Sequence, residues 1–172
     1  MNIKKILPAL TSLSLVMGLS ACVMDTPTIS DGPSNEETTT TPETQGVGKF
    51  GQVFSWETAD LTVSKPKPYE PTNMAAGADD FPDTVSVDVK LTNTGDELLD
   101  PTLVMVTASS GEHEASQVFD ANSDTGPTTS IKPGKSVNWT VIFNVASAKD
   151  VTVEVSPPEP FTMEPALFST GG

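Results

Sequence analysis

The strongest constraint on the fold is a two-residue alternation of apolar and polar side chains in two segments. In residues 136–145, SVNWTVIFNV, the alternating apolar positions are Val137, Trp139, Val141, Phe143 and Val145. In residues 84–93, TVSVDVKLTN, they are Val85, Val87, Val89 and Leu91. Successive side chains of a β-strand point to opposite faces of its sheet. The pattern therefore predicts two strands, each with one buried and one solvated face.

Turn signals and weaker apolar segments extend this pattern over one domain, residues 49–172. Asn and Gly in NTGDE (93–97) indicate a turn after the first strand, and KPGK (132–135) indicates a type II turn in which Gly134 has positive φ. Weaker strands are expected at 54–64, 102–109, 115–119, 151–155 and 165–169. About seven short strands without helical periodicity predict an all-β, immunoglobulin-like antiparallel β-sandwich. The two long loops, 65–83 and 120–130, are candidates for a binding surface.

The first residues have the pattern of an export signal. Lys4 and Lys5 precede an uncharged, mostly apolar run at 6–19, which is shorter than the roughly 20 residues that a membrane-spanning helix needs. A basic start, an apolar run and small residues before a cleavage site are typical of a secretory signal, here residues 1–21. An ordinary signal with an incidental cysteine remains the alternative.

The residues Leu19, Ser20, Ala21 and Cys22 resemble the lipobox of bacterial lipoproteins. This resemblance implies that the Cys22 thiol carries a diacylglycerol and that the chain is cut before Cys22. It also implies a location at the cell membrane, facing outside the cytoplasm, with the membrane as a partner through the lipid anchor. Two acyl chains give the two hydrophobic signals that stable anchoring requires.

Residues 22–48 differ sharply in composition from the domain that follows. They are rich in Thr, Ser, Pro, Gly and acidic residues, and they contain few apolar side chains. Such a segment buries too little apolar surface to offset the entropy of ordering, so we expect a disordered linker. As a flexible coil it would span about 25–30 Å, which would hold the domain away from the membrane.

The charge of the chain excludes some classes of partner. It has nine Lys and no Arg against 23 acidic residues, a formal net charge of −14. Nucleic-acid binding needs clustered basic side chains, so it is not expected. Electrostatic docking to anionic lipids is disfavoured for the same reason.

The sequence offers little for catalysis or cofactor binding. His113, the single histidine, lies between Glu112 and Glu114, and no G-x-S-x-G motif accompanies it. We expect a solvated loop histidine, no cofactor and no enzymatic activity. A methionine copper site would have to combine Met24, Met74, Met105 and Met163, yet Met105 is expected in the core.

Calcium is the better metal hypothesis, with candidate ligands in the two long loops: Asp79, Asp80, Asp83, Asp120, Asn122 and Asp124. Oxygen ligands at alternate loop positions suit Ca²⁺, and D-x-N-x-D at 120–124 is similar to the start of an EF-hand loop. However, Gly126 falls one place late and Ile131 occupies the twelfth position, where Glu is needed. Turns stabilised by Asp and Asn side chains are therefore the preferred interpretation.

Four features together resemble a known family: the lipobox with its Thr-rich linker, VSVDVKLTNTGDE (85–97), VFDANSDTGP (118–127) and IKPGKSVNWTVIFNV (131–145). They are similar to the telokin-like, immunoglobulin-like domain of unknown function found in actinobacterial and other Gram-positive lipoproteins. That group is related in fold to a secreted mycobacterial antigen. The resemblance implies the sandwich and an envelope location, and it brings no catalytic residues.

The sequence thus leads to two functional hypotheses. The first is a lipid-anchored envelope protein whose non-catalytic domain binds an envelope protein or a ligand through its loops. The alternative is a calcium- or solute-binding module of an envelope transporter or adhesion system.

Overall fold

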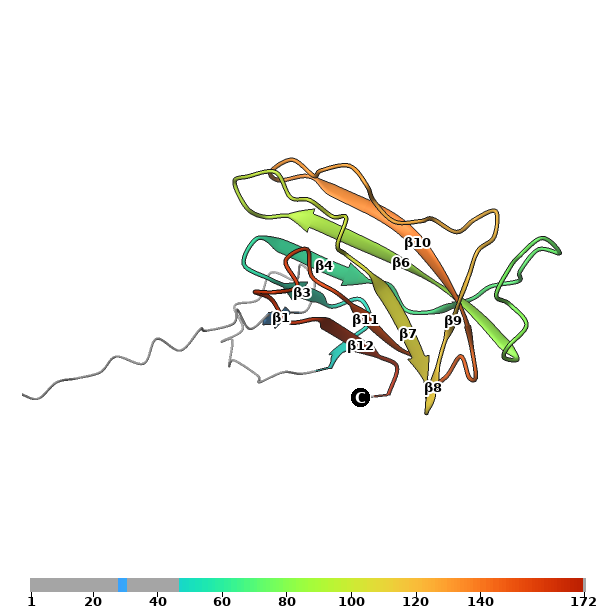
Figure 1. Cartoon of the computed structure of the whole chain (residues 1–172). Helices are drawn as coiled ribbons and strands as arrows, with labels where there is room; N and C mark the ends of the chain where they lie inside the picture. The colour runs from blue at the N-terminus through green and yellow to red at the C-terminus, as the bar shows by residue number, and fades with distance from the viewer. Residues whose placement is uncertain (1–27, 31–46, 172) are drawn as a thin grey trace, which may run out of the picture.

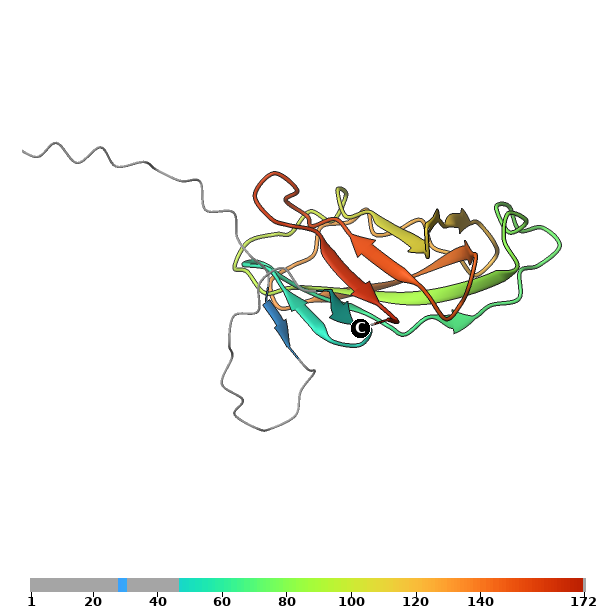
Figure 2. The same cartoon turned by 90° about the horizontal axis from the view of Figure 1, so that it is seen from below.

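The computed structural model describes residues 28–30 and 47–171, which form a two-layer β-sandwich (Figure 1). One layer is a seven-stranded sheet in the order β1 (Thr28–Ser30), β3 (Val53–Ser55), β4 (Ala59–Val63), β6 (Asp83–Asn93), β10 (Ser136–Val145) and β9 (Ser116–Val118), with β5 (Lys67–Pro68) paired to β6 beyond the end of β4. The other is a five-stranded sheet in the order β2 (Gly48–Lys49), β12 (Ala166–Ser169), β11 (Thr152–Val155), β7 (Val106–Ser110) and β8 (His113–Glu114). Figure 2 shows the two layers.

The predicted all-β, immunoglobulin-like antiparallel sandwich is confirmed. All pairings between the named strands are antiparallel except that of β2 with β12. The described residues hold twelve strands rather than about seven, because several strands have only two or three residues. They include no helix, and so none that could cross a membrane.

The two alternating segments form the centre of the larger sheet. β6 and β10 pair over their whole length, from Ser136 opposite Thr92 to Val145 opposite Asp83. The alternating apolar side chains of β6 are all fully buried, as predicted: Val85, Val87, Val89 and Leu91. They face the second sheet, where Phe168 and the valines of β11 complete the core. Burying one such side chain contributes about 1.5–3 kcal/mol.

Two of the weaker strand predictions differ from the structure. The expected strand 54–64 is divided into β3 and β4, because the Trp56 amide bonds to the Ala59 carbonyl (2.8 Å) and closes a hairpin turn. The expected strand 102–109 begins only at Val106, because Pro101 starts a turn in which its carbonyl accepts a hydrogen bond from the Val104 amide. The core assignment of Met105 is consequently wrong, and its side chain is 63% exposed.

The expected linker also contains ordered residues. Thr28–Ser30 pair with β3 as strand β1, and Gly48 belongs to β2, so the prediction of a disordered segment over 22–48 is wrong at these positions. The apolar residue Ile29 explains β1, because it packs against the core cluster. Residues 1–27 and 31–46 lie outside the described part of the chain.

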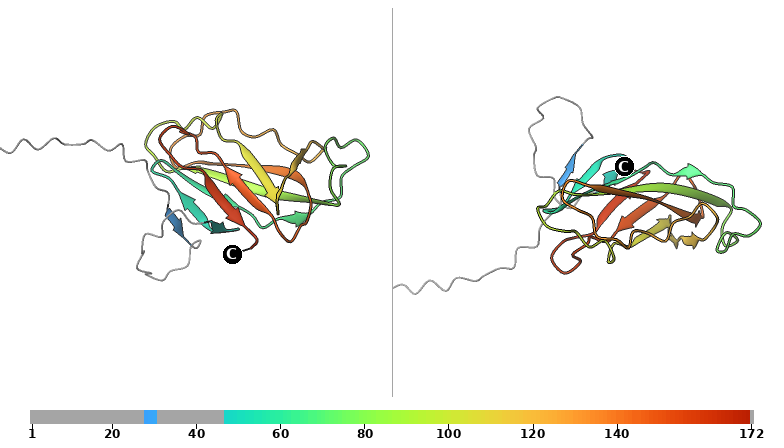
Figure 3. Two further views of the ribbon diagram at one scale, coloured as in Figure 1. Left: turned by 60° about the horizontal axis from the view of Figure 1, so that its bottom comes forward. Right: turned by 90° about the horizontal axis from the view of Figure 1, so that it is seen from above.

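The turns gather at two ends of the sandwich. What we name the entry end contains the turns at 56–58 and 93–105 and the loop Ser156–Pro165, which are linked by hydrogen bonds. What we name the loop end contains the loops 69–82, 120–124 and 146–150. Figure 3 shows the two ends on opposite sides of the molecule.

Candidate functional site at the loop end

The two long loops form one structure at the loop end, joined by the carboxylate of Asp120. Its Oδ2 accepts hydrogen bonds from the Tyr69 hydroxyl (2.9 Å) and the Thr72 amide (2.7 Å). Its Oδ1 accepts from the Thr72 hydroxyl (2.5 Å) and the Ala121 amide (2.8 Å). Donors to the charged form favour ionisation, and those of Thr72 contribute most, so the pKa of Asp120 falls to about 2.

The loop 69–82 also packs onto the outer face of the larger sheet. Asn144 of β10 is fully buried; its Oδ1 accepts the Phe81 amide (2.6 Å) and its Nδ2 donates to the Phe81 carbonyl (2.9 Å). Gly77 has φ of 83°, and a Cβ there would lie 2.5 Å from the Gln117 carbonyl oxygen. The loop therefore approaches β9 at a distance that only glycine allows.

This fixed loop presents apolar side chains to solvent. Met74 is 83% exposed and Phe119 is 52% exposed, and the two segments are connected because Ala76 and Phe119 exchange backbone hydrogen bonds (3.0 Å each). On the adjacent hairpin, the exposed His113 ring lies 5.6 Å from that of Phe81. We name Met74, His113 and Phe119, together with the half-buried Phe81, the loop-end surface. Exposed aromatic and methionine side chains on a fixed backbone suit protein contacts.

The calcium candidates are not brought together as a metal site. Within the described residues, no group of three or more His, Cys, Asp or Glu side chains is arranged to hold a metal ion. Besides Asp120, three candidate carboxylates accept hydrogen bonds from protein donors: Asp80 from Ser116 Oγ, Asp83 from the Ala148 amide and Asp124 from the Thr140 amide. Asn122 Nδ2 donates to the Tyr69 hydroxyl (3.4 Å), and Asp79 is exposed. These hydrogen bonds join positions 16 to 65 residues apart, so the carboxylates of Asp80, Asp83 and Asp124 connect separate segments rather than close the local turns expected from the sequence.

In the described part of the chain, the methionines considered for a copper site are divided between the two ends of the sandwich. Met163 is buried, whereas Met74 and Met105 project into solvent from opposite ends, and Met24 lies outside the described residues. His113 is exposed on the β7–β8 hairpin, as expected for a solvated residue. Cys22, the proposed lipid attachment residue, also lies outside the described residues.

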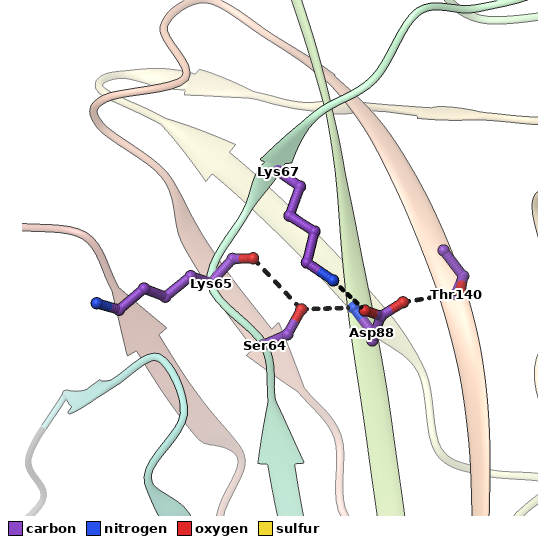
Figure 4. Close-up of polar contacts among 5 residues, drawn as sticks. All are labelled: Ser64, Lys65, Lys67, Asp88 and Thr140. Atoms are coloured by element: carbon purple, nitrogen blue, oxygen red, sulfur yellow. Dashed lines mark hydrogen bonds and ion pairs between the residues drawn. The ribbon is translucent and has the colours of Figure 1, made fainter.

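A second polar cluster stabilises the crossing from β4 to β5 (Figure 4). The Asp88 carboxylate accepts from Lys67 Nζ (2.7 Å) and from the Thr140 hydroxyl (3.0 Å), while Ser64 Oγ accepts the Asp88 amide (2.8 Å). The bond from the Lys67 ammonium is the main reason that the pKa of Asp88 is lowered. Both charged side chains are more than half exposed, so this pair contributes about 0–1 kcal/mol. Ser64 Oγ donates to the Lys65 carbonyl (3.3 Å), so the serine hydroxyl links the segment after β4 to the backbone of β6.

The sequence indicates both long loops but carries no signal for the residues that join them. Tyr69 and Thr72 belong to no recognisable motif. The local signal for their contact with Asp120 is limited to two facts: their loop is long and rich in Pro, and Asp120 begins the other long loop. Phe161 at the entry end is not among the residues singled out by the sequence patterns, although an aromatic residue in the Pro-rich segment PPEPF fits no strand pattern.

Two solved structures show the same fold. The yjhA protein of Bacillus subtilis is 14% identical with a TM-score of 0.58, over 72% of this chain and 99% of that one. The proposed lipoprotein ycdA of Bacillus subtilis is 18% identical with a TM-score of 0.52, over 66% of this chain and 36% of that one, so the similarity spans about a third of its length. A secreted protein of Mycobacterium tuberculosis has a TM-score of 0.42, which is too distant to bear on the fold.

No protein-family model matches the sequence, and no curated protein is similar to it. At these identities, the two B. subtilis structures establish the sandwich fold alone.

Proposed function

We propose that this protein is a lipid-anchored protein of the bacterial cell envelope, whose sandwich binds a partner protein through the loop-end surface without catalysing a reaction. The observation that carries the anchor is the sequence Leu19-Ser20-Ala21-Cys22 after a basic and apolar start. The proposal that ycdA is a lipoprotein agrees with this location for a related fold.

The binding surface is supported by the way the loop end is built. Loops that only connect strands need no fixed shape, yet Asp120 joins two of them and Asn144 attaches one to the sheet. A fixed backbone reduces the entropy cost of binding, since the exposed side chains are already placed. Met74 and Phe119 provide the apolar contacts, and the acidic loop residues around them favour a partner with a basic rim.

The absence of catalysis is part of the proposal. At the loop end, the carboxylates of Asp80, Asp83, Asp120 and Asp124 accept hydrogen bonds that hold the loops, and the His113 ring contacts the Phe81 ring. This arrangement lacks the paired nucleophile and base that covalent or acid–base catalysis needs.

The anchor is tested by fractionating cells that express the full chain or its Cys22→Ala variant. The full chain is expected in the membrane fraction and should be released only by detergent, whereas the Cys22→Ala variant should be soluble outside the cytoplasm. Membrane association that survives Cys22→Ala would refute the lipid anchor.

The binding surface is tested by site-specific photo-crosslinking in intact cells. A photoreactive amino acid at position 74 is compared with one at Thr107, which is exposed on the five-stranded sheet. A discrete adduct from position 74 alone, weakened by Asp120→Asn, is expected. Equal adducts from both positions, or none from either, would contradict the assignment of the loop-end surface.

A further inference from the structure

The chain enters the sandwich at the entry end. Thr28, the first residue of β1, is opposite Ser55, which is followed by Trp56 in the β3–β4 turn. The Trp56 indole Nε1 donates to the Glu164 carbonyl (2.9 Å), so this turn lies against the loop Ser156–Pro165. β1 is antiparallel to β3, which runs toward this turn, so the N-terminal end of β1 lies at the entry end (Figure 1).

The pairing of β1 limits the distance between the domain and a lipid at Cys22. Only residues 23–27 separate Cys22 from Thr28. Even a fully extended chain of that length spans at most about 20 Å. This limit rests on the proposed lipid anchor. It means that the tether between the lipid and the first strand is five residues long, rather than the long linker expected from composition.

The entry end carries exposed apolar side chains on two adjoining segments, joined where the Ser156 amide bonds to the Met105 carbonyl (2.9 Å). We name this set the entry-end patch; its members are Leu98, Leu103, Met105 and Phe161. They are four of the seven large apolar side chains that the described residues expose. Exposed apolar side chains gathered at one end of a domain are typical of a surface that meets a membrane or a protein.

Phe161 is the most exposed member, at 88%, and its loop holds it in place. The base of the loop is buried through Pro157, Pro158 and Met163. The Glu159 carbonyl accepts the amides of Thr162 (3.1 Å) and Met163 (3.0 Å), which closes a tight turn around Phe161. The fold thus fixes the backbone of this loop and leaves the phenyl ring without packing partners that would bury it.

We propose that the entry end faces the membrane and that Phe161, with the rest of the entry-end patch, contacts the lipid interface, which directs the loop-end surface outward. The short tether holds this end near the lipid, so the patch needs little affinity of its own. β6 alone is about 35 Å long, so a loop end directed outward lies well beyond the bilayer surface.

The contact is apolar rather than electrostatic. Asp96, Glu97 and Glu159 also lie at the entry end, and their charges are repelled by anionic lipids. A zwitterionic membrane is therefore the appropriate probe. The contact is expected to weaken as anionic lipid is added.

Tryptophan fluorescence can test this orientation, because both native tryptophans are buried. The full chain, processed and acylated in cells, is reconstituted into phosphatidylcholine vesicles with brominated acyl chains, which quench tryptophan on contact. The probe variant is Phe161→Trp, and the matched control is Met74→Trp at the loop end. Both positions are exposed, so neither substitution should disturb the fold, and circular dichroism verifies this.

The emission of Phe161→Trp is expected to be quenched at least twofold more than that of Met74→Trp. Equal quenching of the two variants, or none in either, in protein that floats with the vesicles would overturn the orientation and leave the lipid anchor intact. Acylation-dependent flotation tests the anchor separately: if the processed full chain fails to float, the proposed function fails.

Discussion

The carboxylate of Asp120 accepts hydrogen bonds from both the backbone amide and the hydroxyl of Thr72, at 2.7 and 2.5 Å. These bonds join two loops that are 48 residues apart in the sequence. The loop-end surface depends on them, because Met74 and Phe119 lie on the two connected segments.

Asp120→Asn should loosen the loop 69–82 without unfolding the sandwich, because one acceptor oxygen becomes a donor. Amide hydrogen exchange at Thr72, followed by NMR, is expected to accelerate about tenfold, the scale of a lost hydrogen bond to a charged group. Asp79→Asn is the control, since Asp79 is an exposed acid in the same loop. An unchanged exchange rate at the Thr72 amide in Asp120→Asn would contradict the role of Asp120 in joining the two loops.

The hydrogen bonds between Asp120 and Thr72 should be lost at low pH. Asp120 has a folded-state pKa of about 2, below its ordinary value of 3.8. A lowered pKa means that the stabilisation is complete above the ordinary value and is lost as pH falls through about 4 to 2. Protection of the Thr72 amide should follow this decline. An Asp120 carboxyl that titrates near pH 4 by NMR would show that the bonds do not favour its charged form.

Gly77→Ala should destabilise the protein more than the same change at Gly126. Both glycines have positive φ, 83° and 88°, so both variants incur backbone strain of about 1 kcal/mol. Only at position 77 does the new Cβ meet the Gln117 carbonyl oxygen, whereas nothing lies within 4 Å at position 126. Chemical denaturation should show an additional loss of about 1–2 kcal/mol for Gly77→Ala. Equal losses would mean that the loop does not need this close approach.

Asn93→Ala should cost about 2–3 kcal/mol in the free energy of unfolding. Asn93 is buried, and its Nδ2 donates to the carbonyls of Glu97 (2.7 Å) and Ile131 (2.8 Å), while its Oδ1 accepts the Gly95 amide (3.0 Å). Alanine leaves these backbone groups without those partners. The exposed residue Asn138 provides the control, and Asn138→Ala should change stability by less than about 0.5 kcal/mol. Similar values for the two variants would refute the structural role of Asn93.

The elements that are best predicted from the sequence are those whose residue pattern lies within one short segment. The alternation in β6 and β10 reports burial of one sheet face directly, so both strands were placed within one residue of their ends. The turn at 132–135 is also predicted correctly, because Gly134 has the positive φ that a type II turn requires. In the segment before β7 the same reasoning failed. There an apolar run reads like a central strand, yet Pro101 turns the chain and exposes Met105.

Features that depend on distant partners could not be read from the sequence. β1 is three residues long and becomes a strand only because β3 lies beside it. The role of Asp120 depends on Tyr69 and Thr72, which reach it only after β5 has positioned their loop. The repeated acidic residues of these loops resemble metal ligands in sequence, and the folded geometry shows that the carboxylates of Asp80, Asp83 and Asp124 accept hydrogen bonds from protein donors.

The most direct test of the lipid anchor is the chemical structure of the mature N-terminus. The protein is purified from membranes of cells that express the full chain, and its N-terminal peptide is examined by mass spectrometry. We expect a chain that begins at Cys22, with a diacylglycerol on the thiol. A mature chain with an unmodified Cys22, or one that retains residues 1–21, would contradict it.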